Sequence, residues 1–318
     1  MLGVASKAFF HALAGSRILK TLASRYGMQH AESPARRFVA GETLEDAIKA
    51  ARQVEACGLL HTLDYLGESV TNVSESEAAA QQYRRIIETL AGAGVGRNVS
   101  VKLTQLGLDV DRATCVDNLR RILDPAQRHD CFVRIDMESS QYAAVTLDIF
   151  ETLWQQGYRN VGIVLQSSLR RSETDLTRIN ALGARVRLVK GAYNEPSQVA
   201  YYKKADVDAA FARMMDTLFR EGTYPAIATH DADLIDRAKQ RAAHVGLTRD
   251  GFEFQMLYGI RRDLQRALAA DSYRVRIYIP FGREWFPYFM RRLGERPANV
   301  LFLIRGLLHE QAPSSPRA

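Results

Sequence analysis

Four polar side chains lie in β-branched runs at positions that a strand would turn inward. Val99, Val101 and Leu103 share one face of the two-residue strand period, so Lys102 must face the other way. The same alternation turns three further side chains inward: Asp136, Arg187 and Tyr278. Burying charged groups is costly unless they pair with one another or meet a ligand. The pattern therefore indicates either an anion-binding redox site or an inert buried ion network.

A second polar group recurs at helical spacing near the end of the chain. Its members fall three and four residues apart, on one face of a helix: Glu284, Tyr288, Arg291, Arg292 and Glu295. A guanidinium fork binds a planar carboxylate with two parallel hydrogen bonds. The motif is thus typical of a carboxylate clamp, although a solvated, salt-bridged helix surface has the same pattern.

Eight short β-branched runs, each followed by a turn and a helical period, must position these side chains. The runs cover residues 59–67, 99–107, 132–139, 161–168, 186–193, 226–231, 252–259 and 274–282. This alternation predicts an α/β protein with a (βα)8 barrel, also called a TIM barrel. The active sites of such barrels lie where the strands end, which is where the inward polar residues fall.

The barrel accounts for most of the 318 residues. We expect an N-terminal helical arm over residues 1–40, the barrel domain over 41–311 and a disordered tail over 312–318. Within the barrel domain, residues 44–57 should form an amphipathic helix that covers the barrel.

The arm is basic and amphipathic. It carries six lysines and arginines against one glutamate, which leaves about +2 of the net charge of +7 for the rest of the chain. A helix of this kind packs on the barrel, binds a partner helix or contacts an anionic membrane surface. Nucleic acid is not expected as a partner.

Several classes of protein are disfavoured by composition and spacing. The longest uncharged stretch, 160–169, is far too short to cross a bilayer, and no signal peptide is expected. The three cysteines form no CxxC pair, and the seven histidines show no metal-binding spacing. We therefore expect no metal and a cytoplasmic location, with peripheral contact at the inner face of the membrane if the arm binds lipid.

Several sequence blocks resemble the proline dehydrogenase family, which includes the first domain of bifunctional proline-utilisation flavoproteins. The blocks are SVKL at 100–103, ID at 135–136, Gln166, RLVKGAY at 187–193, ATH at 228–230, FQMLYG at 254–259, Tyr278 and YFMRRL at 288–293. They occur in order along seven of the predicted strands and the last helix. Agreement of this extent is specific to the family.

The resemblance implies a distorted barrel that binds FAD noncovalently. The enzyme would oxidise L-proline to 1-pyrroline-5-carboxylate by hydride transfer from C5 to flavin N5, as the first step from proline to glutamate. A membrane quinone would accept the electrons. The chain has no room for an aldehyde dehydrogenase domain, so a separate pyrroline-5-carboxylate dehydrogenase is the expected partner for the product.

The resemblance also assigns residues to roles. It implies catalytic roles for Asp136 and Arg187 beside the flavin, where Arg187 would stabilise the negative charge that the flavin gains. It implies that proline is bound by Lys102, Arg291, Arg292, Tyr278, Tyr288 and Leu257. It implies flavin contacts by Met137, Gln166, Arg187, Val189, Lys190, Gly191, Ala192, Thr229, His230 and Glu295. The base that takes the amine proton is left open.

A gate over the substrate is also expected. Glu68 is the last residue of the block 64–68. We predict that it pairs with Arg292 over bound proline, as the family resemblance also suggests. An exposed glutamate on a loop is the alternative.

Three other functions stay open. A flavoenzyme for hydroxyproline is disfavoured by Tyr278, because the ring would crowd a hydroxylated substrate. A barrel lyase would form a Schiff base on Lys102 or Lys190 and would be colourless. A basic, noncatalytic membrane or nucleic-acid adaptor gives no reason for charged side chains to face inward.

Overall fold

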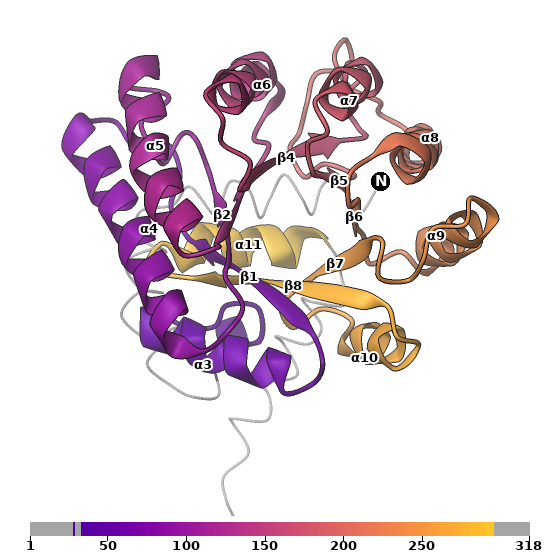
Figure 1. The fold of residues 1–318 in the computed structure, drawn as a ribbon, viewed down its shortest axis with the longest axis horizontal. Helices are drawn as coiled ribbons and strands as arrows, with labels where there is room; N and C mark the ends of the chain where they lie inside the picture. Colours follow the sequence, from indigo (N-terminus) through magenta and orange to yellow (C-terminus); the bar gives the residue numbers. More distant parts are fainter. Residues whose placement is uncertain (1–27, 29–32, 296–318) are drawn as a thin grey trace, which may run out of the picture.

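A closed barrel of eight parallel strands, connected in chain order, forms the centre of the protein (Figure 1). The structure is a computed structural model that describes residue 28 and residues 33–295. The strands are β1 Leu60–Tyr65, β2 Asn98–Val101, β3 Phe132–Ile135, β4 Val161–Gln166, β5 Val186–Val189, β6 Ala226–Ala228, β7 Glu253–Leu257 and β8 Arg274–Phe281. Seven lie within their predicted runs and β2 begins one residue before its run, so the predicted barrel is confirmed.

Helices surround the barrel (Figure 1). They are α3 Leu44–Glu55, α4 Val73–Ala93, α5 Arg112–Arg128, α6 Ser140–Gln155, α7 Ser172–Ala181, α8 Lys204–Glu221, α9 Ala232–His244, α10 Arg262–Ala270 and α11 Trp285–Glu295. The helix expected at 44–57 is α3. Thr43 and Asp46 close its N-terminus with a capping box, and its buried stripe packs against β1 and β8.

The register of the strands fixes which side chains face the barrel interior. Ser100 on β2 is paired with Arg134 on β3, and Leu257 on β7 with Tyr278 on β8. Residues paired in this way share a face of the sheet, and the face alternates with each residue. The outward residues, such as Val99 and Ile135, are fully buried under the helices. The predicted inward orientation of the four polar side chains is thus confirmed.

An ion pair lies on the inner faces of β7 and β8, below the strand ends. Arg276 donates to both carboxylate oxygens of Glu253, at 2.8 and 2.9 Å, and also to the backbone oxygen of His61. Burial disfavours the ionised carboxylate, but the Arg276 guanidinium lowers the pKa of Glu253. The barrel therefore contains a buried structural ion pair in addition to the charged group at the strand ends.

Helix α11 differs in position from the other helices. In the view of Figure 1 it is seen inside the ring of outer helices, near β1 and β8. Its apolar residues form a second buried cluster with Met28, Phe38, Val39 and Leu66. This cluster fixes α11 against the chain that leaves β1, which places the arginines of the helix beside the barrel opening.

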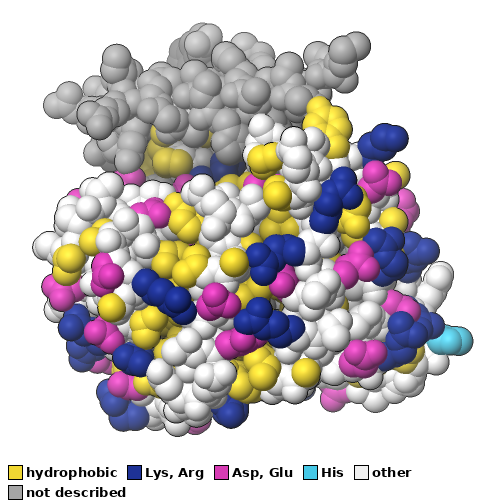
Figure 2. All heavy atoms as spheres, turned by 90° about the horizontal axis from the view of Figure 1, so that it is seen from above, with side chains coloured by type: hydrophobic (Ala, Val, Ile, Leu, Met, Phe, Trp, Pro, Cys, Tyr) yellow, Lys and Arg dark blue, Asp and Glu magenta, His cyan; other side chains and the backbone are white. Residues whose placement is uncertain are grey.

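The surface of the described residues is mixed in charge. Figure 2 shows one face on which lysine and arginine side chains are interspersed with aspartate and glutamate. None of the described helices combines the length and apolar character that crossing a membrane requires. The predicted arm falls mostly, and the predicted tail entirely, outside the described residues, so the helical arm with its roles and the disordered tail stay predictions.

Candidate active site

Lys102 is at the centre of a buried charged cluster above the ends of β1, β2 and β3. Its Nζ donates to Asp64 Oδ1 at 2.9 Å and lies 3.8 Å from Asp136 Oδ2. The Tyr278 hydroxyl is 3.5 Å from the same nitrogen and donates to Asp136 Oδ2 at 2.7 Å. The side chain of Lys102 is 10% exposed and that of Asp64 is 1% exposed. Three of the four predicted side chains therefore meet here.

Arg187 completes the cluster from β5. Its Nη1 donates to Asp136 Oδ1 at 2.7 Å, and its Nη2 donates to Ser100 Oγ at 3.1 Å. The guanidinium also lies 5.4 Å from the centre of the Tyr278 ring. Asp136 is thus held by Arg187 on one oxygen and by Tyr278 on the other, which fixes the orientation of both partners.

The cluster is electrostatically strained by its burial. Burial raises the pKa of Asp64 above its ordinary value, although Lys102 opposes the shift. Burial alone would lower the pKa of Lys102, but the carboxylates of Asp64 and Asp136 raise it well above its ordinary value. Burial and the Asp136 carboxylate raise the pKa of Tyr278, so its hydroxyl stays protonated. Two cations and two carboxylates balance one another in this enclosed space.

One of the two α11 arginines is connected to the cluster through Glu68, whose charge acts on Lys102. Arg291 Nη1 donates to Glu68 Oε1 at 2.7 Å. Arg292 is buried, and its guanidinium lies 5.1 Å from the centre of the Tyr288 ring, which is also buried. Glu68 thus contacts the arginine adjacent to its predicted partner, and the pairing of Glu68 with Arg292 stays a prediction.

The ends of β4 and β5 form a polar cradle. Gln166 Nε2 donates to the backbone oxygens of Met137 and Glu138, at 3.2 and 2.8 Å. Gly191 has a φ of +115°, and a Cβ atom there would lie 2.3 Å from Ser168 Oγ and 2.9 Å from Gln166 Oε1. The backbone can take this course at position 191 because glycine has no side chain.

Two buried polar atoms in this region are candidates for binding a cofactor. Gln166 Oε1 and Arg187 Nε are both buried, and neither has a hydrogen-bond partner among the described residues. An unsatisfied buried polar atom costs about 1–3 kcal/mol, which a ligand can recover. The residues present therefore fit a polar cofactor edge at the ends of β4 and β5.

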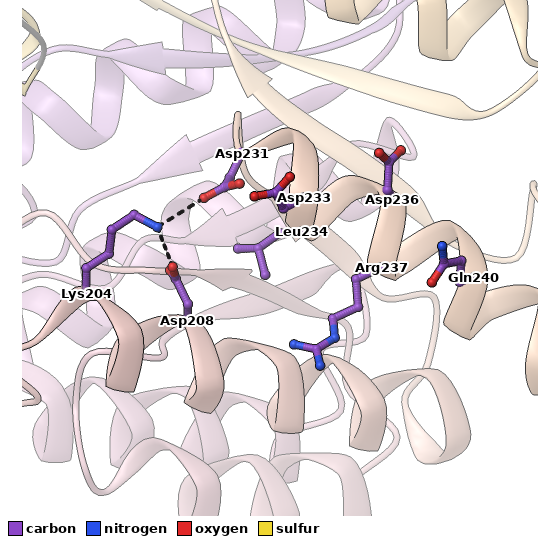
Figure 3. A pocket seen from close by; sticks show the side chains of 8 residues that line it. All are labelled: Lys204, Asp208, Asp231, Asp233, Leu234, Asp236, Arg237 and Gln240. Carbon is purple, nitrogen blue, oxygen red and sulfur yellow. Dashed lines mark hydrogen bonds and ion pairs between the residues drawn. The ribbon is translucent and has the colours of Figure 1, made fainter.

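Lys190 lies further along the same edge, between two carboxylates. Its Nζ is 2.6 Å from Asp208 Oδ1 and 2.9 Å from Asp231 Oδ2, and its hydrogen bond lowers the pKa of Asp231. A cavity of about 410 Å³ adjoins these carboxylates at the start of α8 and α9. Figure 3 shows Lys204 of α8 bonded to Asp208 and Asp231 at this cavity. An anionic cofactor group can reach Lys190 only in competition with the two carboxylates.

The ends of β6 and β7 are joined by a histidine. His230 Nε2 accepts a hydrogen bond from the Leu257 backbone N–H at 2.9 Å. The buried Thr229 hydroxyl accepts from the Asp231 backbone N–H at 3.1 Å, beside the start of α9. Both residues therefore help to shape the rim, whether or not they contact a cofactor.

The remaining predicted residues lie at the same rim. Met137 is buried after β3, Val189 is half-buried at the end of β5, and Ala192 is exposed after it. Leu257 is half-buried and paired with Tyr278. Helix α11 ends at Glu295, whose side chain lies outside the described part of the chain.

Two buried acids that follow or end strands at the barrel opening were not among the predicted site residues. One is Asp64, described above. The other is Glu138, whose carboxylate accepts from the backbone N–H and the hydroxyl of Thr104, while Thr104 Oγ1 accepts from the Ser69 backbone N–H. Glu138 thereby supports the loop that carries Glu68. The run at β1 has polar residues on both faces, so its alternation does not single out Asp64, and no strand period applies to Glu138 because it lies in a turn.

A closed (βα)8 barrel with a charged cluster at its strand ends is the architecture of a barrel enzyme. The chain belongs to the proline dehydrogenase family, because the model of that family matches residues 47–305. The family prediction made from the sequence blocks is confirmed. Membership in this family favours an oxidoreductase over the lyase and the noncatalytic adaptor.

Relatives of the chain agree with this assignment. It is 39% identical to proline dehydrogenase 1 of Bacillus subtilis (strain 168) over 296 residues, which cover 93% of this chain and 97% of that protein. It is 43% identical to the proline dehydrogenase of Deinococcus radiodurans over 278 residues, which cover 86% and 90%. The similarity extends over nearly the whole of each relative.

The structure is also similar to part of a larger protein. Proline utilization A from Bdellovibrio bacteriovorus, in a crystal structure of the form inactivated by N-propargylglycine, superposes with a TM-score of 0.77 at 26% identity. The match covers 88% of this chain and 34% of that one, so the chain spans about a third of its length. The shared part is the barrel.

Proposed function

We propose that this protein is an FAD-dependent dehydrogenase of L-proline, which forms 1-pyrroline-5-carboxylate. The observation that carries the proposal is the cluster of Lys102, Asp136, Arg187 and Tyr278, which is connected to Arg291 of α11 through Glu68. Cations at the barrel opening suit a substrate carboxylate, and a buried guanidinium suits developing negative charge. When bound, FAD would accept the hydride from C5 of proline and pass the electrons to a membrane quinone.

The protein's residues hold the substrate in place. Lys102, Arg291 and Arg292 bind the carboxylate of proline, while Tyr278, Tyr288 and Leu257 form the walls around its ring. Glu68 closes over the bound substrate through an α11 arginine; the contact with Arg291 supports this gate. Fixing the carboxylate orients C5 and excludes water from the reacting bond.

Asp136 and Arg187 act at the reacting end of the site. Asp136 orients Arg187 and Tyr278 through its two oxygens. Arg187 directs its positive charge at the edge where the cofactor gains electrons, and its buried Nε supports such a contact. Arg187 therefore contributes to both catalysis and cofactor binding.

FAD would be held by the rim of the barrel from β3 to β6, with a further contact from the end of α11. The residues proposed for this are Met137, Gln166, Val189, Lys190, Gly191, Ala192, Thr229, His230 and Glu295. Gln166 Oε1 and the glycine at position 191 support the fit. In a barrel with no glycine-rich Rossmann turn, backbone and side chains at the strand ends must hold the pyrophosphate.

The product of this reaction needs a second enzyme. We propose a separate pyrroline-5-carboxylate dehydrogenase as its consumer, in line with the bifunctional protein PutA of Escherichia coli, which is 28% identical over 314 residues. That match covers 24% of PutA. The proposed location is the cytoplasm, with the basic arm contacting the inner face of the cell membrane.

Activity with a quinone analogue tests the proposal. Purified protein should show the visible absorption of FAD and should reduce a soluble quinone analogue when L-proline is added. Hydroxyproline should be a much poorer substrate, because the Tyr278 ring crowds the position of its hydroxyl group. Faster turnover of hydroxyproline would replace the proposed substrate, and a colourless, inactive protein would reject the flavoenzyme.

A further inference from the structure

Asp64 is a buried carboxylate that has no part in the function proposed above. It lies at the end of β1, and its side chain is 1% exposed. Its Oδ1 accepts from Lys102, while its Oδ2 is buried without a hydrogen-bond partner among the described residues. An ionised carboxylate in such a position is costly unless a cation compensates it. Lys102 is that cation.

Lys102 depends on Asp64 in turn. Its side chain is 10% exposed, and its second carboxylate neighbour, Asp136, is 3.8 Å away. Asp136 is already held by Arg187 and by the Tyr278 hydroxyl. Asp64 is therefore the carboxylate that accepts a hydrogen bond from Lys102, and without it the buried ammonium group would keep the longer ion pair with Asp136 but lose its hydrogen-bonded counter-charge.

We propose that Asp64 is a positioning residue that keeps Lys102 charged and aimed at the carboxylate of the substrate. This inference rests on the proposed function, because it takes Lys102 to bind proline. Asp64 acts through Lys102 and does not contact the reacting atoms. Its loss should therefore change the affinity for proline and the dependence of that affinity on pH.

The titratable and charged groups that surround Lys102 come from several elements. They are Asp64 of β1, Glu68 after β1, Tyr83 of α4, Asp136 and Glu138 after β3, Arg187 of β5, Tyr193 after β5 and Tyr278 of β8. Burial lowers the pKa of Lys102, and the carboxylates of Asp64 and Asp136 raise it. Removing the negative charge of Asp64 must therefore lower the pKa of Lys102.

The test compares Asp64→Asn with the wild-type protein across pH 6 to 10. Stopped-flow reduction of the bound flavin at increasing L-proline gives both the dissociation constant and the limiting rate constant. The titration of proline itself cancels in the ratio of the two proteins. We expect the dissociation constant of the variant to rise relative to wild type by up to about tenfold per pH unit once Lys102 loses its proton. The limiting rate constant at pH 6 should change by less than about threefold.

Glu253→Gln is the matched control. It removes another buried carboxylate of the barrel, whose partner is Arg276. An arginine stays protonated across this range, so the control should show no new dependence of proline binding on pH. The same alkaline loss in both variants, or in neither, would overturn the proposal. So would a low limiting rate at every pH with unchanged affinity, because Asp64 would then act at the reacting atoms.

Thermal unfolding without proline separates this inference from the proposed function. In Asp64→Asn the folded protein would bind fewer protons than the unfolded chain at pH values between the lowered pKa of Lys102 and the pKa of a lysine in the unfolded chain, so its stability relative to wild type should rise with pH across that window. If the stabilities of Asp64→Asn and wild type change with pH in the same way, the inference is contradicted. If proline fails to reduce the flavin of the wild-type protein, only the proposed function is contradicted. If Asp64→Asn does not fold, the double variant Asp64→Asn/Lys102→Met should fold again, because it leaves no unpaired charge; its failure would also count against the proposal.

Discussion

Replacing Arg187 by methionine should impair both stability and catalysis, by amounts that follow from its contacts. The Arg187 side chain is 5% exposed and donates to Asp136 and Ser100 at 2.7 and 3.1 Å. Breaking a buried ion pair costs about 3–5 kcal/mol. The lower end applies, since Asp136 keeps its hydrogen bond from Tyr278. At about 2 °C or more per kcal/mol for a domain of this size, Tm should fall by about 6 °C.

The catalytic loss should be larger than the loss in substrate binding. Arg187 is proposed to stabilise charge that appears only in the transition state, so its removal should lower the rate of flavin reduction by about 10²–10³. Stopped-flow measurements at saturating proline give this rate directly. Arg187→Lys keeps the charge but loses the fork, so it should restore stability in part and the rate much less.

Arg178→Met is the control for this experiment. Arg178 pairs with Asp148 and Glu151 on the surface, where its side chain is 45% exposed. Exposed pairs contribute about 0.5 kcal/mol, so this variant should keep both its Tm and its rate. A loss in Arg187→Met confined to the affinity for proline, or a Tm equal to that of the control, would refute the role given to Arg187.

Three further predictions concern the gate, the cofactor cradle and the cysteines. Glu68→Ala should weaken proline binding and leave the FAD content unchanged. A double-mutant cycle of Glu68→Ala with Arg291→Met should show about 1 kcal/mol of coupling, because the two side chains are in contact. Additive effects would exclude this contact as the gate. Gly191→Ala should lose FAD, because a Cβ atom at this positive φ would collide with its neighbours. Gly92→Ala in α4 is the control, and it should raise the stability by up to about 1 kcal/mol. Equal FAD content in the two variants would contradict the cradle. Burial raises the pKa of the Cys115 and Cys131 thiols to about 12, whereas Cys57 is exposed. Iodoacetamide at pH 8 should therefore label Cys57 alone in the native protein, as mass spectrometry would show. Labelling at either buried cysteine would contradict their packing.

The barrel and its inward side chains could be predicted because strands impose a strict period. The alternation along each β-branched run shows which of its residues share a face. Residues that are paired between neighbouring parallel strands point to the same side of the sheet. Lys102, Asp136, Arg187 and Tyr278 therefore meet as expected. Their roles toward proline and FAD come from the family resemblance and stay proposals.

Other parts of the site depend on features that no local pattern contains. The run at β1 has polar residues on both faces, with His61 near Glu55 on one side and Asp64 on the other, so its alternation is unclear. Which α11 arginine meets Glu68 depends on the rotation of the helix about its axis, since adjacent residues point about 100° apart. Packing of the apolar residues around α11 sets that rotation.

An anaerobic titration of the purified protein with L-proline tests the central claim most directly. The protein should contain FAD, and its flavin absorbance should bleach as proline is added, until all the bound flavin is reduced. Absence of bleaching in a protein that is shown to hold FAD would contradict proline as the substrate. Bleaching that is slowed by about 10²–10³ in Arg187→Met, with FAD still bound, would place the chemistry at the cluster described here.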